Sequence, residues 1–154
     1  MIPFFLIFFS VLALDVGTKI LVRASLPMGT EVHLLPFFSL THVENTGIAF
    51  GLFPGRNAIL IGLGILIMTV MTFSAIRLLR QDRFIGLVLA AVLGGALGNI
   101  ADRVFNGAVT DFLDFYWGAY HWPSFNVADS AICVGMVLLI GRSFFGQAHG
   151  PDPL

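Results

Sequence analysis

The sequence contains little charge and almost no cysteine. Charged residues make up 11% of the 154 residues and hydrophobic residues 57%, whereas about a quarter of an ordinary soluble domain is charged. The formal net charge of −1 argues against a nucleic-acid partner, because phosphate binding requires clustered Lys and Arg. The single cysteine, Cys133, excludes an internal disulfide. Most of the chain is therefore expected to face lipid.

The sequence also lacks any feature that would divide it. It has no Ser/Gly linker, charge block, low-complexity run or internal repeat, which predicts a single domain over residues 1–154. Residues 1–14 have neither a basic region nor a small-residue cleavage site before Asp15. We therefore expect this segment to be a membrane helix and not a secretory signal.

Four apolar stretches are long enough to cross a bilayer, whose hydrocarbon core of ~30 Å takes about 20 residues of helix. These predicted spans are residues 2–22, 58–79, 84–103 and 127–145. The turn between the second and third spans contains Arg77, Arg80 and Arg83. The positive-inside rule places this turn, and hence both termini, in the cytoplasm. The two long connections, residues 23–57 and 104–126, are then extracytoplasmic.

The long connections mix β-branched and aromatic residues between Gly and Pro, a pattern that favours short strands. Strands are expected at residues 31–35, 38–44 and 109–116, forming a small extracytoplasmic sheet. Residues 45–47 are expected to turn, and residues 48–53 to begin a short interfacial helix.

Two aspartates are expected at one depth near the outer face. Asp102 follows the start of the third span by 18 residues, about 27 Å of helix, and Asp129 begins the antiparallel fourth span. Each follows an asparagine at i−3, Asn99 or Asn126, which could hydrogen-bond to its carboxyl group. Two carboxylates in contact share a proton, as acid–base hydrolysis of a peptide requires. Asp102 and Asp129 are therefore the predicted catalytic pair, with Arg103 supporting the geometry or the negative charge.

Other interpretations of these acids stay open. Asp129 would suit a helix N-terminus, where negative charge is favoured. Paired intramembrane aspartates also serve proton relays in transporters, although no pair of broken helices marks the bilayer midplane here. In a structural subunit the polar residues would only guide helix association. The repeated Asn-x-Ala-Asp spacing favours the peptidase.

The remaining polar residues are expected to serve structure. Asp15 and Lys19 are spaced i, i+4, which predicts a structural ion pair and favours it over a substrate contact. Ser130 has no base that the sequence identifies, so a serine nucleophile is a weak alternative. Small residues at every fourth position predict close helix packing: Gly86, Ala90, Gly94 and Gly98. The histidines lack ligand spacing, so no metal or cofactor is expected: His33, His42, His121 and His149.

Four blocks of sequence occur in a fixed order along nearly the whole chain. They are Asp15-Val-Gly-Thr18-Lys19; Glu44-Asn45-Thr46-Gly47-Ile48-Ala49-Phe50-Gly51; Gly98-Asn99-Ile-Ala-Asp102-Arg103 continuing through Gly107, Val109, Asp111, Phe112 and Asp114; and Phe125-Asn126-Val-Ala128-Asp129. Together they resemble bacterial lipoprotein signal peptidase, also called signal peptidase II. The resemblance implies an all-α membrane protein with four transmembrane helices, a small extracytoplasmic β-cradle and a short interfacial helix.

The resemblance also implies an activity. A protein of this family is a membrane aspartic endopeptidase of the bacterial cytoplasmic (inner) membrane. It removes signal peptides by cleaving before a diacylglyceryl-modified cysteine, and globomycin inhibits it. Its implied partners are the prolipoprotein substrate and membrane lipids, and we expect a monomer.

The family's catalytic dyad corresponds in this resemblance to Asp102 and Asp129. Four further residues match polar positions around the substrate and the dyad: Asn45, Asn99, Arg103 and Asn126. Three apolar residues are expected to cover the site: Phe50, Leu52 and Phe53.

Overall fold

A computed structural model describes residues 1–47 and 55–145 of the chain. Its four long helices are α1 (Ile2–Ser25), α2 (Asn57–Gln81), α3 (Arg83–Asn106) and α4 (Val127–Phe145). Each is long and apolar enough to cross a membrane, because an uninterrupted apolar run of this length satisfies its own backbone hydrogen bonds as a helix. The four predicted spans are confirmed, and α1 and α3 continue three residues beyond their expected ends at residues 22 and 103.

The third helix lies at the centre of the bundle and packs against the other three. Leu89 and Leu93 of α3 form a buried cluster with Ala75 of α2. A Cβ atom on Gly94 would lie 2.5 Å from the carbonyl oxygen of Phe8 on α1. One on Gly95 would lie 2.7 Å from the carbonyl oxygen of Ala128 on α4. Small residues on α3 therefore permit the close approach of both neighbouring helices.

Both ends of α3 have a defined cap. The Asp82 carboxylate accepts hydrogen bonds from the backbone N–H groups of Phe84 and Ile85, which stabilises the N-terminus. These bonds, with Ile85 foremost, and the Arg142 guanidinium at 3.0 Å lower the pKa of Asp82. At the other end Gly107 adopts a left-handed conformation with φ of 81°, which favours glycine. The chain then passes directly into the sheet.

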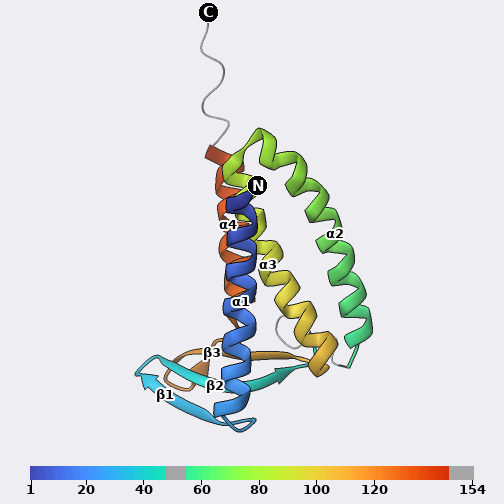
Figure 1. The fold of residues 1–154 in the computed structure, drawn as a ribbon. Helices are drawn as coiled ribbons and strands as arrows, with labels where there is room; N and C mark the ends of the chain where they lie inside the picture. Colours follow the sequence, from blue (N-terminus) through green and yellow to red (C-terminus); the bar gives the residue numbers. More distant parts are fainter. Residues whose placement is uncertain (48–54, 146–154) are drawn as a thin grey trace, which may run out of the picture.

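Four short antiparallel strands form that sheet: β1 (Glu31–Leu35), β2 (Phe38–Asn45), β3 (Val109–Trp117) and β4 (Tyr120–His121), in the order β1-β2-β3-β4. The three predicted strands are confirmed, whereas the two-residue β4 is too short for a sequence pattern. The sheet lies at the end of the bundle opposite the N-terminus and the α2–α3 connection (Figure 1). Two sequence predictions, the interfacial helix at residues 48–53 and the cover formed by Phe50, Leu52 and Phe53, lie outside the described residues.

Candidate active site

A cavity of about 900 Å³ lies where α3, the start of α4 and the sheet meet. The polar side chains at its wall come from all three parts, and they include Glu44, Asn45, Asn99, Arg103, Asp111, Asp129 and Ser130. Its apolar wall includes Val43, Val109, Phe125 and Val134. A large concave site with an apolar wall and a few converging polar groups is the usual form of a ligand-binding or catalytic pocket.

Asp129 lies in the first turn of α4 and lines this cavity. The backbone N–H of Asn126 donates a hydrogen bond to Asp129 Oδ2 at 3.3 Å, and the Asp129 N–H donates to Asn126 Oδ1 at 2.9 Å. The expected contact between residues i and i+3 is therefore present here, made through the two backbone N–H groups. This reciprocal pattern is a helix cap, and it orients the Asp129 carboxylate.

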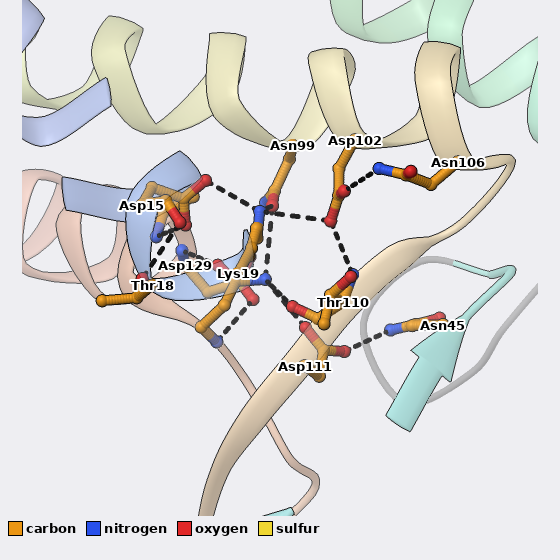
Figure 2. Close-up of polar contacts among 12 residues, drawn as sticks. Asp15, Thr18, Lys19, Asn45, Asn99, Asp102, Asn106, Thr110, Asp111 and Asp129 are labelled. Carbon is orange, nitrogen blue, oxygen red and sulfur yellow. Dashed lines mark hydrogen bonds and ion pairs between the residues drawn. The ribbon is translucent and has the colours of Figure 1, made fainter. Parts of the chain in front are cut away.

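Asn99 differs from the expectation that it would bond to Asp102 on its own helix. Its Nδ2 donates instead to Asp129 Oδ1 on α4, at 2.8 Å. Its Oδ1 accepts a 2.7 Å hydrogen bond from Lys19 Nζ on α1. Asn99 thus joins three helices, because a helix-embedded amide has both a donor and an acceptor to satisfy. Figure 2 shows Asn99 between Lys19 and the neighbouring polar groups.

A second aspartate at the cavity wall is Asp111 of β3, which the sequence analysis did not select. Asp111 is only 3% exposed. Its Oδ1 accepts a 2.8 Å hydrogen bond from Asn126 Nδ2, and its Oδ2 accepts one of 3.0 Å from Asn45 Nδ2. Burial, reinforced by the nearby charge of Asp129, raises the pKa of Asp111 to about 7. A substantial fraction of Asp111 is therefore protonated at neutral pH.

Asn126 connects the two aspartates of the cavity. It is fully buried, its side chain donates to Asp111 Oδ1, and its backbone N–H donates to Asp129 Oδ2. Asn126, at the junction between the sheet and α4, therefore fixes the position of Asp111 on the strand relative to Asp129 on the helix.

Asp102 has a different environment from the one that we expected. Its Oδ1 accepts hydrogen bonds from Arg23 Nη1 at 2.7 Å and Asn106 Nδ2 at 2.6 Å. Its Oδ2 accepts one from the Thr110 backbone N–H at 2.7 Å and lies 3.7 Å from Lys19 Nζ. Asp102 lines a separate pocket of about 220 Å³ and not the larger cavity. Every one of these contacts neutralises or fixes the carboxylate, which is typical of a structural ion pair. Figure 2 shows the contacts of Asp102 with Asn106 and Thr110.

The ion pair expected between Asp15 and Lys19 is present, with Nζ 2.8 Å from Oδ2. Both side chains are almost completely buried, at 0% and 1% exposure. Asp15 Oδ1 also accepts a 2.8 Å hydrogen bond from the backbone N–H of Ala128. The first helix thereby holds the residue that immediately precedes Asp129.

Arg103 and Asn45 both line the cavity, and each anchors backbone beside it. The Arg103 guanidinium donates to the carbonyl oxygen of Gly47, and the Arg103 carbonyl accepts a 2.9 Å hydrogen bond from Asn57 Nδ2. Asn45 Oδ1 accepts from the Gly47 N–H at 2.9 Å, which forms the turn expected at residues 45–47. These contacts hold the chain at the mouth of the cavity.

Comparison with known sequences gives consistent matches. The family model described as signal peptidase (SPase) II matches residues 7–145. The lipoprotein signal peptidase of Vibrio cholerae is 35% identical over 144 residues, covering 90% of this chain and 84% of that protein. The lipoprotein signal peptidase of Desulforapulum autotrophicum is 42% identical over 148 residues, covering 92% and 90%. That of Serratia marcescens is 41% identical over 141 residues, covering 88% and 81%.

Two solved structures, both of bacterial membrane enzymes determined by the in meso method, have the same fold. The one at 2.3 Å resolution has a TM-score of 0.90 and 27% identity, covering 98% of this chain and 93% of that chain. The one at 1.9 Å resolution has a TM-score of 0.83 and 29% identity, covering 92% of each chain. The bundle and the sheet described above are therefore common to this chain and to experimentally determined membrane enzymes.

Proposed function

The chain belongs to the signal peptidase II family, and we propose that it is an aspartic endopeptidase that cleaves before a lipidated cysteine. Members of this family remove signal peptides from prolipoproteins in the bacterial membrane. The observation that supports this mechanism is the pair of carboxylates, Asp111 and Asp129, that line one cavity and share hydrogen bonds with Asn126. Two acids in such a setting titrate as a pair and provide both an acid and a base.

The proposed pair retains Asp129 from the sequence prediction and replaces Asp102 with Asp111. Asp102 is bonded to Arg23, Asn106 and the backbone of Thr110. These contacts, with Lys19 Nζ 3.7 Å away, tie Asp102 to α1 and to the sheet, and Asp102 does not line the cavity that Asp129 lines. Asp111 faces the cavity that Asp129 lines, and its pKa is already raised to about 7.

The first chemical step requires one ionised and one protonated acid. Asp129 is the base: it takes a proton from a water molecule while the water oxygen attacks the scissile carbonyl carbon. Asp111 is the acid: it donates its proton to the carbonyl oxygen, so that no isolated oxyanion forms. The product of this step is a neutral tetrahedral diol, with the proton now on Asp129 and the charge on Asp111.

Collapse of the diol uses the two groups in reverse. Asp129 donates its proton to the nitrogen of the leaving amine, and Asp111 recovers a proton from a hydroxyl group of the diol as the carbonyl reforms. The C–N bond breaks, and the lipidated cysteine leaves with a free amino group. The pair returns to its starting protonation state, and the cycle requires neither a metal nor a covalent intermediate.

Lipid modification of the substrate fits the location of the cavity. The cavity lies at the sheet end of the membrane helices, and its wall combines polar groups with Phe125, Cys133 and Val134. Acyl chains of the substrate would remain beside the helices while the scissile bond reaches the acids. A cluster of basic residues lies near the opposite end of the bundle: Arg77, Arg80 and Arg83. By the positive-inside rule this cluster supports an orientation with the cavity at the outer face and both termini in the cytoplasm. One domain, acting as a monomer, is sufficient for this chemistry.

The test uses the full chain in detergent with a diacylglyceryl-modified precursor and mass spectrometry of the products. We expect the mature product to begin at the lipidated cysteine, the same precursor without its lipid to be cut far more slowly, and globomycin to block the reaction. A chelator is expected to leave the initial rate unchanged. Cleavage at another bond, or equal cleavage of the unmodified precursor, would contradict the proposal.

A further inference from the structure

The sheet contains a second group of ionisable side chains, separate from the cavity. Glu31 of β1, Asp114 of β3 and His121 of β4 each place one potential ligand atom within 4.8 Å of the other two. Ser39 of β2 lies among them, with its Oγ 2.5 Å from Glu31 Oε1 and 3.1 Å from Asp114 Oδ2. His121 Nδ1 lies 2.7 Å from the same Asp114 oxygen. All four strands therefore contribute to one small polar site.

The side chains at this site leave Asp114 of β3 with only part of its hydrogen-bonding capacity satisfied. Asp114 is 5% exposed, yet among residues 1–47 and 55–145 its Oδ1 has no hydrogen-bond partner. A buried carboxylate oxygen without a partner is costly. The Ser39 hydroxyl has a single hydrogen, so it can donate to Glu31 or to Asp114 but not to both. A cation bound beside the two carboxylates would balance the charge that a single Ser39 hydrogen leaves unbalanced, and its contact with both Asp114 oxygens would give Oδ1 a partner.

We propose that Glu31, Asp114 and His121 bind a zinc ion. Two carboxylates and one imidazole form a mixed oxygen and nitrogen ligand set that suits zinc, with a water molecule as the fourth ligand. Calcium and magnesium prefer sites made of oxygen ligands alone. Zinc bound at His121 Nδ1 would place the remaining ring proton on Nε2. The histidine spacing gave no reason to expect a metal, because two of the ligands are carboxylates on strands far apart in sequence.

The zinc would stabilise the sheet without taking part in cleavage. Its ligands belong to the edge strand β1, to β3 and to the two-residue β4, so one ion would hold the weakest strands to the centre. Asp111 and Asp114 are three residues apart on β3, and residues at an odd spacing on a strand face opposite sides of the sheet. The metal site therefore lies on the other face from the proposed catalytic acid.

Calorimetry tests this proposal. Zinc chloride is titrated into the full chain in detergent after treatment with a chelator. We expect one zinc per chain, with binding weakened at least about tenfold in His121→Ala and in Asp114→Asn. Glu44→Gln is the matched control, because Glu44 Oε1 also lies near a histidine, 3.4 Å from His42 Nε2, but has no third ligand within the part of the chain that the structure describes. This control is expected to bind zinc as the unaltered chain does.

A thermal unfolding series with the same proteins gives an independent readout. Added zinc should raise the unfolding temperature of the unaltered chain and of Glu44→Gln, but not of His121→Ala. The side chain of His121 is 45% exposed, so its loss should not prevent folding even if Asp114→Asn does. The proposal is overturned if the unaltered chain shows no saturable zinc binding, or if His121→Ala binds zinc as tightly as the control.

Discussion

Two groups of acidic residues meet at β3 and differ in how their charge is balanced. In one group Asp102 and Asp15 are paired with the cations Arg23 and Lys19. In the other group Asp111 and Asp129 receive hydrogen bonds mainly from neutral amides. Side chains of adjacent strand residues point to opposite faces: the Thr110 hydroxyl accepts a hydrogen bond from Arg23, while the side chain of Asp111 lines the cavity.

On the proposed mechanism, this difference separates residues that hold helices together from residues that react. Arg23 and Lys19 balance the charge of Asp102 and Asp15 and fix their positions between elements. Neutral amides orient a carboxylate while leaving its proton affinity high enough for acid catalysis. The mere presence of an intramembrane aspartate therefore does not identify a catalytic group, whereas the identity of its partners does.

The largest expected effect is the loss of cleavage when either cavity acid is neutralised. Asp111→Asn or Asp129→Asn keeps the size of the side chain but removes an acid or a base from the transition state. We expect the rate of precursor cleavage in detergent to fall by at least about a thousandfold. The control is retention of the folded state, measured by circular dichroism and size-exclusion chromatography. Substantial cleavage by either folded variant would refute the proposed pair.

Neutralisation of Asp102 is expected to affect stability more than chemistry. Asp102→Asn leaves Arg23 without its carboxylate partner, and the loss of one member of a buried ion pair costs about 3 kcal/mol of unfolding free energy. Activity per folded molecule should remain within about tenfold of the unaltered chain, because the cavity acids are unchanged.

The interaction energy between Asp102 and Arg23 can be isolated by denaturant unfolding. The proteins compared are the unaltered chain, Asp102→Asn, Arg23→Gln and the double variant. The comparison between the two groups would be reversed if Asp102→Asn stayed fully stable but lost as much activity as Asp129→Asn. In that case the pair first predicted from the sequence would be the catalytic one.

The smallest effect concerns the pH dependence of the reaction. The proposed acid, Asp111, must be protonated, and burial together with Asp129 raises its pKa to about 7. The value of kcat/KM should therefore fall about tenfold per pH unit above this pKa. Asn45→Ala removes a hydrogen bond that favours the ionised form of Asp111, so it should move the alkaline limb to higher pH by less than about one unit.

The matched control for this pH profile is Asn106→Ala. Asn106 donates a 2.6 Å hydrogen bond to Asp102, which is the equivalent contact in the other group of acids. We expect this change to leave the alkaline limb in place. A limb that moved equally in both variants would indicate a general electrostatic effect and not titration of Asp111.

The fold was largely predictable because its main signals are local. The apolar runs predicted four helices at nearly correct positions, and alternating β-branched and aromatic residues predicted β1, β2 and β3. The ion pair between Asp15 and Lys19 followed from a spacing of four residues on one helix. In each case neighbours in sequence are also neighbours in space, so the pattern contains the necessary information.

The partners of the acids were less predictable because they depend on contacts between distant segments. Helix spacing suggested that Asn99 would bond to Asp102, but the rotation of α3 in the bundle directs Asn99 toward Asp129. Nothing near Asp102 in sequence indicates Arg23, which is 79 residues away. The available signal for Asp111 was its position in the Val109-Thr110-Asp111-Phe112 segment, since an acid in an otherwise buried strand requires partners.

The hydrogen bond from the Ala128 N–H to Asp15 has a consequence for biogenesis. The polypeptide leaves the ribosome from its N-terminus, so the first three helices and the sheet are synthesised before the segment that contains Asn126 and Asp129. Until that last segment inserts, a nascent chain has Asp111 without Asp129 and without the Asn126 amide that bonds to it. On the proposed mechanism, proteolytic competence is therefore acquired only when the fourth helix is in place.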